Sequence, residues 1–145
     1  MSTRTVVRDR IVAEFETMQA ARSGLVPEFD ISLRWLTETE TKRAGTYCVI
    51  VTDEQRTSQT LQHDAYQLSG AVVSYAQDTK DARAKMDLMI EDALAVLRRA
   101  FQALTGVLQK ASVESVTTTE ASTAEGDWPQ AVIRWSAVHR RAVMV

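Results

Sequence analysis

The chain has 145 residues, of which 45% are hydrophobic and 25% are charged, and its net charge is −2 at pH 7. This composition fits one globular domain with its own core and excludes a chain that is disordered throughout. The acidic balance gives no sign of a protein that grips duplex DNA by its phosphates, because such proteins carry a basic excess or a basic face.

The first predicted element is a helix over residues 4–21, because apolar residues recur there at spacings of four, four and three. A strict alternation of apolar and polar residues from Phe29 to Trp35 predicts a strand with one buried face. The polar residues 37–46 indicate a hairpin loop, and the apolar run 47–51 indicates a central return strand. The apolar side chains expected on the helix are Val7, Ile11, Phe15 and Met18.

Residues 52–64 are polar, and we expect a long loop there, of a kind that is often functional or mobile. A third strand is predicted over residues 65–77, where Gly70 indicates a bulge or a bend. The clearest element is a helix over residues 79–107, whose N-terminus Asp78 can cap. Its apolar stripe consists of Met86, Ile90, Ala93, Leu97, Phe101 and Leu104.

Two further strands are predicted over residues 113–119 and 130–143, separated by an acidic turn at 120–127. Links of hairpin length join the first two strands and the last two. The order of elements therefore predicts an α+β fold in a single domain, residues 1–145, with an antiparallel or mixed five-stranded sheet and both helices on one face. One face of the last strand would carry Ile133, Trp135, Ala137 and His139.

Motifs for catalysis or metal binding are largely missing from the sequence. There is no Gly-rich phosphate loop, and His63 and His139 stand in no metal-ligand spacing. The single cysteine, Cys48, lies in an apolar run that favours a buried core thiol. Acidic residues of the long helix favour capping and a solvated face over a metal site. That set comprises Asp78, Asp81, Asp87, Glu91 and Asp92.

Three segments together resemble a known family. They are the strand Ala71–Asp78, the helix that follows it, and the ending Pro129–Trp135. Their order and lengths are similar to those of the tail terminator (tail-completion) proteins of long-tailed bacteriophages and phage-like particles, over most of residues 1–143. The helix positions that carry the resemblance are Asp87, Ile90, Glu91, Asp92, Leu94 and Leu97.

This resemblance implies a structural virion protein that is not an enzyme and has no cofactor or metal. Such a protein forms a ring, usually a homohexamer, at the head-proximal end of the tail tube, in the neck of the particle. Its partners would be further copies of itself, the tail tube protein and the head connector or stopper protein. DNA would cross the lumen without specific binding, and no membrane is involved. The alternatives are another head–tail connector or neck protein, a non-phage protein-binding domain, and a small enzyme that uses His63, Asp64 or the acidic helix.

Contacts between subunits are expected at polar loops and along the basic last strand. Trp128, at a loop-to-strand boundary, suits an interface as well as a core. A head-to-tail contact that pairs a basic edge with acidic loops repeats around a ring and closes if the rotation allows. The candidate contact residues are Glu38, Glu40, Asp53, Glu54, Arg56, Trp128, Arg134, His139, Arg140 and Arg141.

Overall fold

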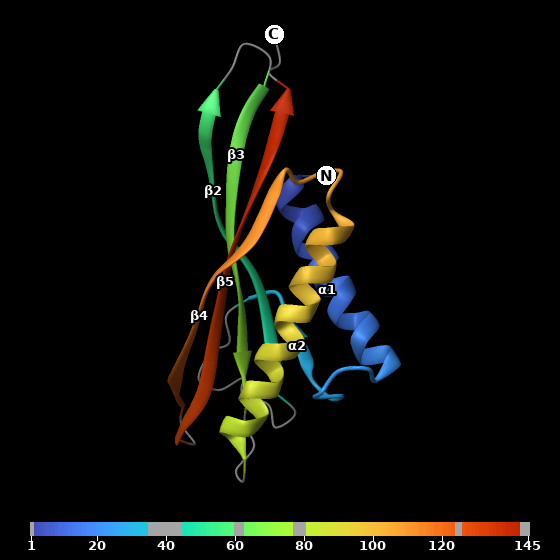
Figure 1. The fold of residues 1–145 in the computed structure, drawn as a ribbon. Helices are drawn as coiled ribbons and strands as arrows, with labels where there is room; N and C mark the ends of the chain where they lie inside the picture. The colour runs from blue at the N-terminus through green and yellow to red at the C-terminus, as the bar shows by residue number, and fades with distance from the viewer. Residues whose placement is uncertain (1, 35–44, 60–62, 77–80, 124–125, 143–145) are drawn as a thin grey trace.

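A twisted five-stranded mixed sheet runs the length of the molecule, and both helices pack on one of its faces (Figure 1). The computed structural model describes residues 2–34, 45–59, 63–76, 81–123 and 126–142. The strand order is β1-β2-β3-β5-β4, so the predicted α+β fold is confirmed. In chain order the elements are α1 (Thr3–Ala21), β1 (Asp30–Ser32), β2 (Thr46–Gln59), β3 (His63–Tyr75), α2 (Ala82–Ala103), β4 (Lys110–Thr123) and β5 (Gly126–Ala142).

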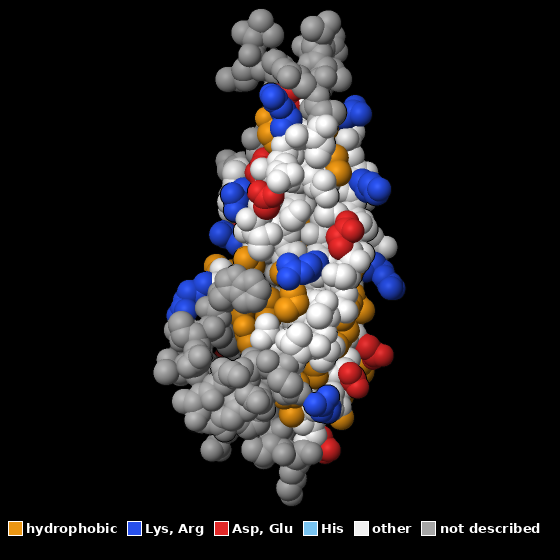
Figure 2. All heavy atoms as spheres, turned by 90° about the vertical axis from the view of Figure 1, so that its left-hand side faces the viewer, with side chains coloured by type: hydrophobic (Ala, Val, Ile, Leu, Met, Phe, Trp, Pro, Cys, Tyr) orange, Lys and Arg blue, Asp and Glu red, His pale blue; other side chains and the backbone are white. Residues whose placement is uncertain are grey.

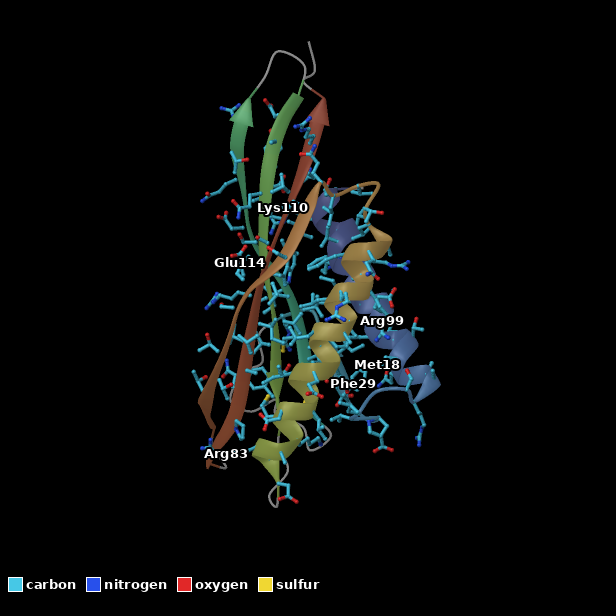
Figure 3. The ribbon with its side chains drawn as sticks, in the orientation of Figure 1. Met18, Phe29, Arg83, Arg99, Lys110 and Glu114 are labelled. Carbon is cyan, nitrogen blue, oxygen red and sulfur yellow. The ribbon has the colours of Figure 1, made fainter. Side chains whose placement is uncertain are left out.

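Helix α1 begins at a side-chain cap and ends at a left-handed residue. The Ser2 hydroxyl accepts the Thr5 backbone N–H at 3.2 Å, which satisfies one of the free donors of the first turn. At the other end Arg22 adopts the left-handed conformation, with φ 51°, and its backbone N–H donates a hydrogen bond to the carbonyl oxygen of Gln19. The apolar face that periodicity predicted is buried as expected, with Met18 reaching toward the loop that carries Phe29 (Figure 3).

Strand β1 is shorter than predicted, and its direction relative to β2 is the opposite of the expected one. It spans Asp30–Ser32 and pairs in parallel with residues 46–48 of β2, so the expected antiparallel hairpin is wrong. The alternating pattern continues to Trp35, but the Ser32 hydroxyl donates to the Arg34 carbonyl and accepts the Arg34 N–H. Such local side-chain bonds compete with a strand ladder and end it. Residues 35–44 of the expected loop lie outside the described residues.

The polar stretch expected as a long loop is mostly strand. β2 continues to Gln59 and β3 begins at His63, and the two pair in antiparallel fashion up to Gln59 and Asp64. We call this part, residues 52–59 and 63–68, the hairpin arm, because it extends beyond both helices (Figure 1). Among the described residues no helix covers the outer part of the arm, although Leu68 at its base belongs to the core. The outer strands can therefore carry polar residues without losing their pairing, and polarity alone was misleading.

Gly70 makes room for a tryptophan. A Cβ atom at this position would lie 2.2 Å from Cζ2 of Trp135, which is its register partner on β5, and 2.6 Å from the carbonyl oxygen of Ile50. The predicted bulge is present, but on the partner strand, where the register shifts between Val51 and Asp53. The glycine is therefore required because the Trp135 ring approaches the backbone of residue 70 closely, which is the other common reason for glycine inside a strand.

Helix α2 provides most of the cover for the sheet. It is shorter than residues 79–107, and Asp78 lies outside the described residues. Of the predicted stripe, Ile90 and Phe101 are half-buried and the others are buried.

Three aromatic rings, Phe15, Phe29 and Tyr47, meet between α1 and the sheet, with ring centroids 4.4–6.0 Å apart.

The last two strands form a long antiparallel pair. Register pairs reach from Lys110 with Val138 to Thr123 with Gly126, so most of the expected turn 120–127 is strand. The predicted inward face of β5, with Ile133, Trp135, Ala137 and His139, is confirmed, since all four are at most 1% exposed. β5 itself lies between β3 and β4, in the interior of the sheet.

Candidate interaction site at the edges of the sheet

The expected contact residues lie at three places in the chain. Glu38 and Glu40 are outside the described residues. Trp128 and Arg141 belong to β5, but their side chains are outside the description. The other six lie on β2 and β5, and they are Asp53, Glu54, Arg56, Arg134, His139 and Arg140.

Two of these residues meet inside the subunit at the base of the hairpin arm. His139 Nε2 lies 3.4 Å from Glu54 Oε1, and the two side chains are 2% and 14% exposed. The Tyr66 ring stacks on the imidazole with centroids 5.5 Å apart and an interplanar angle of 17°. β2, β3 and β5 each supply one member, so this cluster holds the arm together. A buried His139 is not available as a surface contact.

The arginines of β5 do not form an edge of the sheet. Arg134 and Arg140 are exposed, but they belong to an interior strand and lie on the face away from the helices. The expectation of a basic edge is therefore wrong, because the fold places β4 outside β5. Figure 2 shows this helix-free face, with polar and charged side chains over its upper part and apolar ones gathered lower down. Its buried apolar cluster consists of Cys48, Ala71, Val73, Tyr75 and Val132.

The outer edge of β4 is a long exposed strand. In the described part of the chain β4 pairs on one side only, with β5, and residues 113–119 are all exposed. Val113 and Val116 are 38% and 43% exposed, although they stand opposite buried residues of β5 on the helix side. Unpaired edges with exposed β-branched residues are sites where another strand can add.

A hollow of about 530 Å³ runs beside this edge, between the end of α2 and the start of β4. Its apolar wall includes Leu94, Phe101 and Val113. The cations Arg98 and Lys110 also line it, and Figure 3 shows Lys110 at the start of β4. The hollow is thus an apolar shelf whose lining also includes two cationic residues.

The opposite edge of the sheet is uncovered over the hairpin arm. β1 pairs with residues 46–48, and among the described residues no strand lies beside β2 beyond them. Arg4 of α1 donates to the Val51 carbonyl at 3.3 Å. The arm beyond that point presents the exposed residues Asp53, Gln55, Arg56 and Thr57.

One buried carboxylate was missed by the sequence analysis. Asp92 was assigned to a solvated helix face, but it is 5% exposed and accepts the backbone N–H groups of Leu25 and Val26 at 2.9 Å each. Its signal was positional, because residue 92 falls three after Met89 on the inward face. Burial, and secondly the charge of Asp92, raise the pKa of the Tyr47 hydroxyl.

Comparison with known proteins leaves the function to be argued from the structure. No protein-family model matches the chain, and no curated protein matches its sequence. Within the described ranges, no three His, Cys, Asp or Glu side chains are grouped so that they would hold a metal ion. In that same part of the chain, neither helix is long and apolar enough to cross a membrane.

Proposed function

We propose that the protein is a tail terminator, a structural virion protein of the neck of a phage or phage-like particle. It closes the head-proximal end of the tail tube, ends tube polymerisation and forms part of the joint with the head. The observation that carries this proposal is that, in the described part of the chain, two unlike edges on opposite sides of one sheet are open, the hairpin arm on β2 and the outer edge of β4.

Unlike edges favour a ring over a symmetric pair. When one surface of a subunit meets a different surface of the next, the contact is head-to-tail, and it closes into a ring if the rotation permits. A subunit of this kind also offers the ring two ends with different chemistry. The described arm residues Asp53, Gln55, Arg56 and Thr57 are polar and exposed, which suits hydrated contacts with the tail tube protein or the head connector.

The charge of the chain suits a ring that DNA traverses. The net charge is −2, so the subunit as a whole does not attract phosphates. Passage without retention requires a lumen that is not strongly basic, since each phosphate contact adds affinity.

Particles lacking the protein test this function directly. We expect removal of its gene from the phage that encodes it to give tails of uncontrolled length without heads, seen by negative-stain electron microscopy. Tails of normal length that stay unjoined would instead identify a connector or another neck protein. Normal joined particles would exclude both roles.

A surface variant separates the arm from the rest of the molecule. The double substitution Asp53→Lys and Arg56→Asp reverses two exposed charges and leaves the strand pairing intact. We expect folded protein but defective joining or length control. The matched control is Glu16→Lys on the exposed side of α1, which should support normal particles.

A further inference from the structure

We infer that the outer edge of β4 in one copy pairs, in antiparallel fashion, with the hairpin-arm edge of β2 in the next copy. The two sheets then become one continuous sheet across the subunit boundary. This inference rests on the proposed ring and names the contact that builds it. The observations that carry it are the direction, level, charge and exposed apolar surface of the two edges.

Strand direction favours this pair. Each step from β2 to β3, from β3 to β5 and from β5 to β4 is antiparallel, so β2 and β4 run in opposite directions. A rotation about an axis along the strands preserves their direction. The β2 strand of a neighbour therefore arrives antiparallel to β4, which is the more stable form of pairing.

The two edges share one level over a short stretch, residues 53–55 of β2 and 110–112 of β4, whereas residues 116–119 of β4 are level with residues 46–49, most of which pair with β1. When register partners are followed across β3 and β5, Asp53 is level with Ser112 and Gln55 is level with Lys110. All four belong to the helix-free side of the sheet. A ring without axial rise thus brings these residues beside one another.

Charge complements this register. If Asp53 lies opposite Ser112 of the next copy, Lys110 is its diagonal neighbour, within reach of a long side chain. Both Asp53 and Lys110 are exposed in the single subunit. An opposite-charge pair at this place favours the heterologous contact, whereas pairing β4 with β4 gains nothing from Asp53.

Apolar surface beside β4 gives the contact a hydrophobic part. The shelf formed by Leu94, Phe101 and Val113 borders the edge, and an added strand covers it. β4 also lacks most of the usual protection of an edge strand. Residues 111–119 contain no proline, and the charge in this stretch, Glu114, is held by Ser136 on β5.

Cross-linking between two single-cysteine variants tests the contact. The probes are Gln55→Cys on the arm and Ser112→Cys on β4, and the native Cys48 is buried. Equal amounts are mixed at millimolar concentration, treated with a short bis-maleimide and resolved by mass spectrometry, with one variant tagged. We expect mixed dimers from the pair and none from Gln55→Cys mixed with Glu16→Cys.

The charge pair supplies a second arm of the experiment. We expect Asp53→Lys to lower the cross-linked fraction by up to about fivefold, the scale of one exposed ion pair. Adding Lys110→Asp on the other partner should restore it. Cross-linking of Ser112→Cys alone at an equal yield would show β4–β4 pairing and overturn the inference. The inference would also be overturned if no mixed product formed either at millimolar concentration or on isolated particles.

Failure of this contact is distinguishable from failure of the proposed function. Mixed cross-links together with normal tails in the absence of the gene would retain the contact and exclude the terminator role. Uncontrolled tail length without mixed cross-links would retain the role and exclude the contact.

Discussion

At the scale of single residues, Asp92 connects helix α2 to the link between α1 and β1. Its carboxylate accepts two backbone N–H groups that have no strand or helix partner of their own. The sequence favoured a solvated face for Asp92, and composition does not show which backbone groups meet it. Those donors lie 66 and 67 residues away in sequence, so no local pattern predicts the contact.

We expect Asp92→Ala to lower the free energy of unfolding by about 2–4 kcal/mol, because each buried N–H left without an acceptor costs about 1–3 kcal/mol. Urea titration followed by tryptophan fluorescence measures the change. The control is Asp87→Ala on the same helix, where the side chain is exposed and an effect within about 0.5 kcal/mol is expected. Equal effects of the two substitutions would contradict the role of Asp92.

Gly70 and Trp135 provide a second residue-scale prediction. Gly70→Ala should destabilise the fold by about 1–3 kcal/mol, because the new methyl group overlaps the indole ring. Gly106→Ala is the matched control, since a Cβ there meets no atom within 4 Å. Combining Gly70→Ala with Trp135→Phe should recover part of the loss in a double-mutant cycle. Additive losses would mean that the ring is not the obstacle.

The pH dependence of stability is expected to include Tyr75. Burial, and secondly Cys48, raise the pKa of its hydroxyl from 10.0 to about 12 in the folded protein. A raised pKa means that this contribution to stability is complete below pH 10 and is lost as the pH rises through about 12. Ultraviolet titration of tyrosinate should show the delayed ionisation, and Tyr75→Phe should flatten the alkaline loss of stability.

At the scale of elements, the helices were predictable and the strands only partly so. The spacing of apolar residues identified both helices, because a helix that packs on a sheet must bury one face. The same logic missed the hairpin arm, since strands without a helix above them carry no alternating pattern. It also missed the parallel β1, because the strand beside which a segment lies depends on distant residues. The contact of Glu54 with His139 likewise joins strands that are remote in sequence.

Packing of α2 on the sheet can be tested at Leu97. This side chain is fully buried, so Leu97→Ala should cost about 2–5 kcal/mol of unfolding free energy. Leu88→Ala on the same helix is the control, because Leu88 is 40% exposed and its truncation leaves no cavity. An unchanged melting temperature for Leu97→Ala would mean that the helix is misplaced.

At the scale of the whole molecule, the core and the hairpin arm should differ in local stability. The arm has strand pairing and the Glu54–Tyr66–His139 cluster, whereas the core has two helices over the sheet. We expect backbone amides near Gln55 to exchange with deuterium faster than those near Val72.

His139→Ala should speed exchange in the arm and leave α2 unchanged. Arg140→Ala removes the exposed neighbour on the other face and should change neither region. Uniform acceleration across the molecule after His139→Ala would contradict the separation of arm and core.

The hydrogen bonds from residues 25 and 26 to Asp92 also bear on how the chain folds during synthesis. The segment that follows α1 cannot reach its partner until 66 further residues have been added. At about 5–20 residues per second, that interval is roughly 3–13 s. Strand β2 is made within this interval, but α2 is completed only after it, so the apolar face of α1 lacks its cover by α2 until then. The nascent N-terminal helix is therefore a segment on which chaperones would act until α2 has been made.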